Sequence, residues 1–177
     1  MTPVEIALLV FVVACAVAAA ALRDVLASII AFGAFSLGIA AVWVLLRAPD
    51  VGLTEAAVGA GVMTVLFLLT IAKTVRPADE ALFESVDPWA LVTAVALVAV
   101  LATTLGALPA VGAADEPVTG GDVTTYYLEN SYEDTEVENA VTAVLAAYRG
   151  FDTMGEAVVV YAAGVSLLTV FGREVFG

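Results

Sequence analysis

Five long apolar runs constrain this chain more than any other feature of its sequence. Each run supplies about the number of residues that an α-helix needs to cross roughly 30 Å of hydrocarbon. Hydrophobic residues make up 62% of the chain, whereas apolar residues are near half of an ordinary soluble domain. The sequence therefore predicts an all-α integral membrane protein with five transmembrane helices, which we place at residues 6–22, 25–46, 56–72, 89–111 and 157–171.

The net negative charge and the scarcity of cysteine and histidine exclude several classes of function. The net charge is −13, and most acidic residues lie outside the apolar runs, which argues against nucleic acid and anionic lipid as partners. One cysteine and no histidine leave none of the usual ligands for zinc, haem or iron–sulfur clusters, so we expect no metal and no cofactor. We also expect no enzyme, because Ser36, Ser166 and Thr70 lie in apolar runs without a histidine and should bond to helix carbonyls.

The few basic residues predict an orientation in the membrane. Four of them fall on one side of the predicted spans and two on the other: Arg23, Lys73, Arg76 and Arg173 against Arg47 and Arg149. By the positive-inside rule, the N-terminus lies outside and the C-terminus inside. The acidic segment 112–139 holds no Lys or Arg and would be external.

Two prolines suggest how the chain is divided. Pro77 and Pro88 bracket an acidic linker after the third predicted span. We therefore predict a three-helix module at residues 1–80, followed by a module at 81–177 with two spans and the acidic segment.

Glu55 stands at the start of the third predicted span, where an ionised carboxylate would be costly in lipid. One interpretation is a helix start, with Thr54 as the N-cap and Glu55 in the first turn, favoured by the helix dipole. The other is that Glu55 faces protein, water or an ion. Gly59 and Gly61 follow closely and permit either close helix packing or an irregular helix.

A second charged stretch precedes the last apolar run. A continuous helix from Ala140 to Phe171 would be about 48 Å long, too long for one span, so the helix must break. We expect Asn139 to cap a short lateral or half-span helix, Gly150 to end it in the left-handed conformation, and Thr153 to restart the chain with a capping box.

The charges beside that break allow two interpretations. In the first, they are caps at the membrane interface, with Arg149 paired to Asp152. In the second, a broken helix bearing Arg149, Asp152 and Glu156 lines a hydrated path, as discontinuous helices do in many transporters.

Both charged stretches resemble known membrane proteins. Residues 22–62, with the motif APDVGLTEAAVGAG, look like the small MbhD component of membrane-bound hydrogenases. Residues 126–160, with the motif YRGFDTMGE, are similar to the MbhE module. In tandem, the two resemble the C-terminal region of the large A-type component of Mrp multisubunit cation/proton antiporters.

The resemblance implies a component of a sodium/proton antiporter in the plasma membrane, whose partners are other small membrane subunits, sodium ions, protons and the lipid bilayer. It makes Glu55 the leading candidate for the ion pathway, Glu156 and Asp152 the second, and Arg149 the residue that tunes their charge. The long antiporter-like part of the A-type component is missing here, so the chain should need partner proteins for activity. A component of a hydrogenase or complex I-like membrane arm, and a purely structural assembly protein, are the alternatives.

Overall fold

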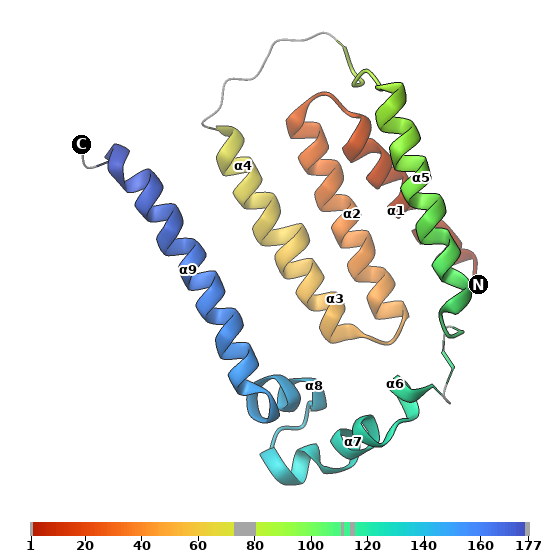
Figure 1. Ribbon diagram of the computed structural model, residues 1–177, viewed down its shortest axis with the longest axis vertical. Coiled ribbons are helices and arrows are strands. Elements are labelled where there is room, and N and C mark those ends of the chain that lie inside the picture. The colour runs from red at the N-terminus through yellow and green to blue at the C-terminus, as the bar shows by residue number, and fades with distance from the viewer. Residues whose placement is uncertain (1, 73–80, 111, 114–115, 176–177) are drawn as a thin grey trace. The chain divides into compact units, whose positions relative to one another are not determined.

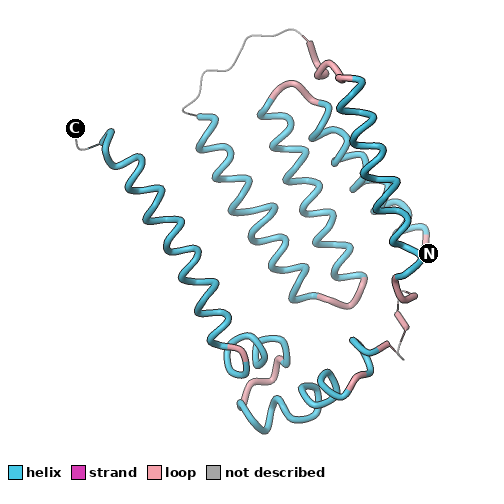
Figure 2. The backbone as a smooth tube through the Cα atoms, viewed as in Figure 1, coloured by secondary structure: helices cyan, strands magenta, loops and turns pink. Residues whose placement is uncertain are grey.

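Most of the residues that the computed structural model describes are helical, and the described residues are 2–72, 81–110, 112–113 and 116–175. No strand occurs in these residues (Figure 2). Lys73, Arg76 and Pro77, on which the predicted orientation and module boundary partly rest, lie outside the described residues. The chain forms two compact units, Met1–Leu101 and Ala102–Gly177, whose α-helices are labelled in Figure 1.

Within the described residues, five helices are long and apolar enough to cross a membrane, which confirms the predicted number of spans. Two of them are α1 (Pro3–Ala21) and α2 (Val25–Leu45). The third is continuous through α3 (Pro49–Glu55), the π-helix η1 (Ala56–Met63) and α4 (Thr64–Ala72). The last two are α5 (Pro88–Thr104), extended by the 3₁₀ turn η2 (Leu105–Ala107), and α9 (Gly150–Val175).

Three predicted span boundaries were wrong, each for a local reason. The third span begins at Pro49 rather than residue 56, because proline suits the first position of a helix. The fourth ends at Ala107, since Leu108 precedes a proline and is extended. The fifth begins at Gly150, so its polar first turns belong to the helix.

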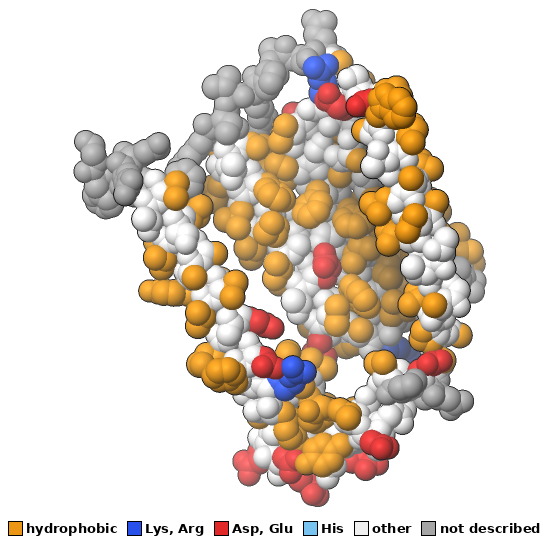
Figure 3. Space-filling model, in the orientation of Figure 1, with side chains coloured by type: hydrophobic (Ala, Val, Ile, Leu, Met, Phe, Trp, Pro, Cys, Tyr) orange, Lys and Arg blue, Asp and Glu red, His pale blue; other side chains and the backbone are white. Residues whose placement is uncertain are grey.

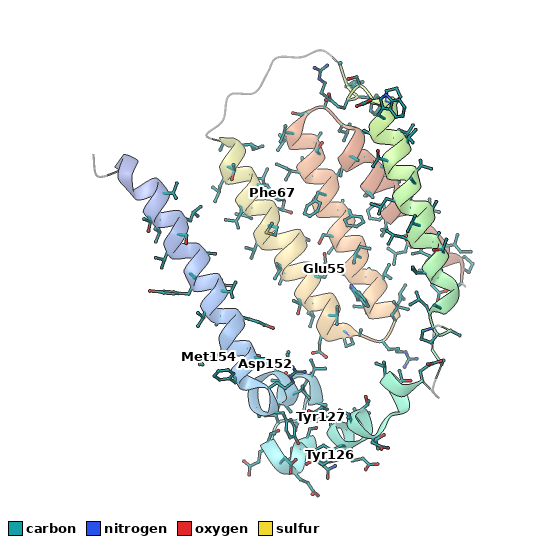
Figure 4. The ribbon with its side chains drawn as sticks, in the orientation of Figure 1. Glu55, Phe67, Tyr126, Tyr127, Asp152 and Met154 are labelled. Carbon is teal, nitrogen blue, oxygen red and sulfur yellow. The ribbon has the colours of Figure 1, made fainter. Side chains whose placement is uncertain are left out.

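The first unit is held together by close approaches between helices at glycine. Gly52 of α3 lies against the backbone of α2: a Cβ at this position would be 2.8 Å from the Ala40 carbonyl oxygen. Phe32 of α2 and Phe67 of α4 meet edge to face, with ring centroids 5.9 Å apart (Figure 4). Elsewhere apolar side chains cover the helices (Figure 3), as lipid-facing surfaces require.

The second unit contains the acidic segment. It comprises the single turn α6 (Pro117–Gly120), α7 (Asp122–Thr135), the short helix formed by α8 (Ala140–Ala143) and η3 (Val144–Tyr148), and α9. Acidic side chains gather over α7 in Figure 3. The predicted cap of the short helix is confirmed, because the Asn139 side chain accepts a hydrogen bond of 2.8 Å from the Thr142 amide.

Three tyrosines and one carboxylate join α7 to the short helix. The rings of Tyr127 and Tyr148 lie 4.9 Å apart, and Tyr126 packs on both. The hydroxyls of Tyr126 and Tyr148 both donate to Asp134 Oδ2, at 3.0 and 2.5 Å. The aromatic segment around Tyr126 therefore packs on the residues that precede the helix break.

This contact predicts an alkaline transition. The hydrogen bond to Asp134 raises the pKa of Tyr148 from 10.0 to about 12. Because the folded state raises this pKa, the contribution of Tyr148 to stability is complete below about pH 10 and is lost as the pH rises through about 12. Asp134→Asn keeps all tyrosines but removes the charge, so it should bring the last tyrosinate transition back toward pH 10.

Ultraviolet absorbance of tyrosinate in the detergent-solubilised protein measures this change. Glu133→Gln is the matched control, because it neutralises the neighbouring carboxylate, whose side chain is not the acceptor of these hydroxyls. A transition that stays near pH 12 in Asp134→Asn would contradict the assigned cause.

Candidate functional site

Glu55 lies inside the third span, not at its start. The span begins six residues earlier at Pro49, so Glu55 is about 9 Å along the helix axis from that end. Thr54 is not an N-cap either, since its hydroxyl donates to the Asp50 carbonyl at 2.9 Å within the helix. The interpretation of Glu55 as a first-turn residue capped by Thr54 is therefore wrong.

The carboxylate of Glu55 is hydrogen-bonded to the neighbouring span. Ser36 of α2 donates its hydroxyl to Glu55 Oε1. Ser36 is 1% exposed, and Glu55 is half-buried and lies beside α2 (Figure 4). The structure thus places a half-buried ionisable group at the contact between two spans, paired with a polar group from the neighbouring helix.

The position of Ser36 shows how far this contact lies from the ends of α2. Ser36 is eleven residues after the start of α2 at Val25 and nine before its end at Leu45. At 1.5 Å per residue, it is about 14 Å from the nearer end of the helix. The contact is therefore near the middle of α2, where a span that crosses the bilayer is furthest from water.

Gly59 provides the space that the contact occupies. A Cβ at this position would meet the Ser36 hydroxyl and would lie 2.6 Å from Glu55 Oε1. The residue belongs to η1, whose wider π-helical turn starts directly after Glu55. Bulges of this kind inside α-helices are frequent at functional positions.

The structure differs from the sequence prediction for one of three hydroxyls. Thr70 and Ser166 donate at 2.8 Å to carbonyls four residues earlier, as predicted. Ser36 does not take this partner. Its hydroxyl bonds across to Glu55 instead, and it is a candidate site residue that the sequence prediction missed.

In the second unit, Arg149 and Asp152 meet at the helix break. Arg149 Nε lies 2.6 Å from Asp152 Oδ2, and this hydrogen bond raises the pKa of Arg149. Both side chains are more than half exposed. Glu156 lies one turn further along α9 from Asp152, on the same face, and is exposed.

The break itself is confirmed, but its details differ from the prediction. The short helix ends at Tyr148, Arg149 follows it with φ −118° and ψ 29°, and Gly150 starts α9 instead of adopting the left-handed conformation. Thr153 does not cap the new helix. Thr153 lies inside α9, which starts at Gly150, and its hydroxyl donates back across the break to the Leu145 carbonyl at 2.7 Å.

Comparison with known families matches most of the chain in two segments. The MbhD family, described as the D component of MBH, matches residues 10–76. The MbhE family, described as the E component of MBH, matches residues 93–174. Glu55 falls in the first segment, and Arg149, Asp152 and Glu156 fall in the second.

Two curated bacterial proteins are similar to nearly the whole chain. Both carry the name "Putative antiporter subunit mnhA2". The protein from Staphylococcus haemolyticus is 26% identical over 174 residues, which cover 95% of this chain and 20% of the relative. The protein from Staphylococcus saprophyticus is 24% identical over 168 residues, with the same coverage. The chain thus spans about a fifth of the length of these relatives.

Proposed function

Because the chain belongs to the family of tandem MbhD and MbhE modules found in the C-terminal region of the A-type components of Mrp antiporters, we propose that it serves a multisubunit sodium/proton antiporter as a membrane subunit, with Glu55 on the ion pathway. The observation that supports this role is the part-buried hydrogen bond that joins Ser36 and Glu55 across two neighbouring spans. A carboxylate at such a place is costly, and in membrane proteins such residues usually belong to ion or proton paths.

The chemistry is an exchange at one carboxylate. Glu55 holds either a cation or a proton, so the two ions compete for the same group and the movement of one is coupled to the other. Two conformations that expose the carboxylate to opposite sides would give the exchange its direction. Sodium is the cation that the family resemblance implies.

The helix break in the second unit supplies further candidate groups. We assign Asp152 and Glu156 to the pathway as secondary carboxylates, and Arg149 as the cation that tunes them through its contact with Asp152. The wide exposure of this ion pair leaves it accessible to water and to partner subunits.

The setting that we propose is the plasma membrane, with the N-terminus outside and the C-terminus inside. The modules are divided near residue 80, in the linker that the two family matches leave uncovered. Other proteins of the antiporter complete the proton path, so activity requires the assembled complex.

Inverted membrane vesicles test this function. Vesicles from cells with the complete gene cluster are compared with vesicles from cells that lack this chain, and with cells in which it is restored. Adding sodium should release protons from the vesicles only where the chain is present. Sodium-driven flux that persists without the chain would contradict the proposal, and proton movement driven by hydrogen evolution without sodium dependence would indicate a hydrogenase arm.

A further inference from the structure

We propose that Ser36 is the positioning residue of Glu55: it holds one carboxylate oxygen, and the other oxygen is the atom that exchanges cation and proton. Gly59 is the second element of this arrangement, because it leaves the carboxylate room to reach Ser36. The inference rests on the proposed function of Glu55 and assigns roles to two residues outside it.

The first observation behind this proposal is the hydrogen-bond acceptor of the Ser36 hydroxyl. Serines inside helices usually satisfy their hydroxyl on a carbonyl of the preceding turn, as Ser166 does here. Ser36 is almost completely buried, so its hydroxyl needs a protein partner, and that partner is a carboxylate on another span. The Ser36 hydroxyl therefore fixes Glu55 relative to α2.

A hydroxyl group also suits a carboxyl group that changes its state. It donates to Oε1 of the ionised carboxylate, and it still donates to Oε1 as the carbonyl oxygen when the proton is on Oε2, so the contact survives both halves of the exchange. Because Ser36 occupies Oε1, Oε2 is left for the ion. One monovalent cation replaces one proton at that oxygen, and the charge of the site stays constant.

The second observation is the lack of space for a side chain at Gly59. A methyl group at this position would lie 2.6 Å from Glu55 Oε1 and would also overlap the Ser36 hydroxyl. Gly59 has no positive φ, so its backbone conformation does not require glycine. Glycine is needed at this position for the space that it leaves.

The chain offers a matched control for that space. Gly61 lies in the same π-helix, but a Cβ there would meet only the Ala56 carbonyl oxygen, at an ordinary distance of 3.4 Å. Gly59→Ala and Gly61→Ala make the same chemical change two residues apart. They differ in whether the new methyl group enters the contact between Ser36 and Glu55.

The experiment measures the sodium dependence of proton flux in vesicles of equal complex abundance. Ser36→Ala should raise the half-saturating sodium concentration about tenfold or more, with a smaller change in maximal rate, because a hydrogen bond to a charged group is lost. Gly59→Ala should show the same rise or lose flux, and Gly61→Ala should match the wild type. A general folding defect would lower abundance and maximal rate but would not change half-saturation.

Glu55→Gln, measured in parallel, separates this inference from the function on which it rests. If Glu55→Gln is inactive and Ser36→Ala keeps the wild-type half-saturation, Ser36 does not position the carboxylate and the inference is overturned. Wild-type behaviour of Gly59→Ala would overturn the role of Gly59. If Glu55→Gln itself transports normally, the proposed function fails first.

Discussion

Glu55→Gln is expected to reduce sodium-driven proton flux to the level of vesicles without the complex, while the complex stays assembled. Glutamine has nearly the shape of glutamate, and its side-chain oxygen can still accept the hydrogen bond from Ser36. The amide cannot ionise, so it can neither release a proton nor balance the charge of a cation. The substitution thus removes the chemistry of the site and keeps its packing.

The measurement is flux per assembled complex, with the abundance of each protein determined on the same vesicles. Glu129→Gln provides a control, since it neutralises an exposed carboxylate of α7 outside the candidate spans. Only Glu55→Gln should lose flux. Undiminished flux at equal abundance would leave Glu55 a packing residue and this chain a structural component.

The number of spans could be predicted from the sequence because length and apolarity are enough to define a helix that crosses a membrane. The boundaries of the spans were harder to predict where polar residues lie inside a helix. Asp50 and Glu55 in the third span, and Asp152 and Glu156 in the fifth, interrupt the apolar pattern without ending the helix. Whether such a polar residue ends a helix or lies inside it depends on its hydrogen bonds and its neighbours, which are tertiary features.

The partner of Glu55 could not be predicted for a different reason. Ser36 is separated from it by 19 positions and lies in a helix that is apolar on all sides, so no periodicity marks the face that meets the third span. Gly59 gave a partial signal, because glycine in a span often marks a close approach. The groups that lie against Gly59, the Ser36 hydroxyl and the Glu55 carboxylate, are known only from the packing of the two helices.

Gly52→Ala is expected to have the largest effect on the stability of the first unit. The new methyl group would lie 2.8 Å from the Ala40 carbonyl oxygen and 3.0 Å from Val44 Cγ2. A backbone oxygen in a helix cannot turn aside as a side chain can, so α2 and α3 must move apart. Overpacking of this kind costs about 1–3 kcal/mol, and separating the helices would also weaken the contact between Ser36 and Glu55.

Thermal unfolding and the abundance of the purified complex measure this effect. Gly61→Ala is again the control, because its added methyl group meets only an ordinary contact at 3.4 Å. The difference between the two variants isolates the helix approach from helix propensity, since alanine is the better helix former at both positions. If Gly52→Ala were as stable as Gly61→Ala, the close approach of α2 and α3 at this glycine would not exist in the membrane. The Ser36–Glu55 contact would then need another means of holding the two helices together.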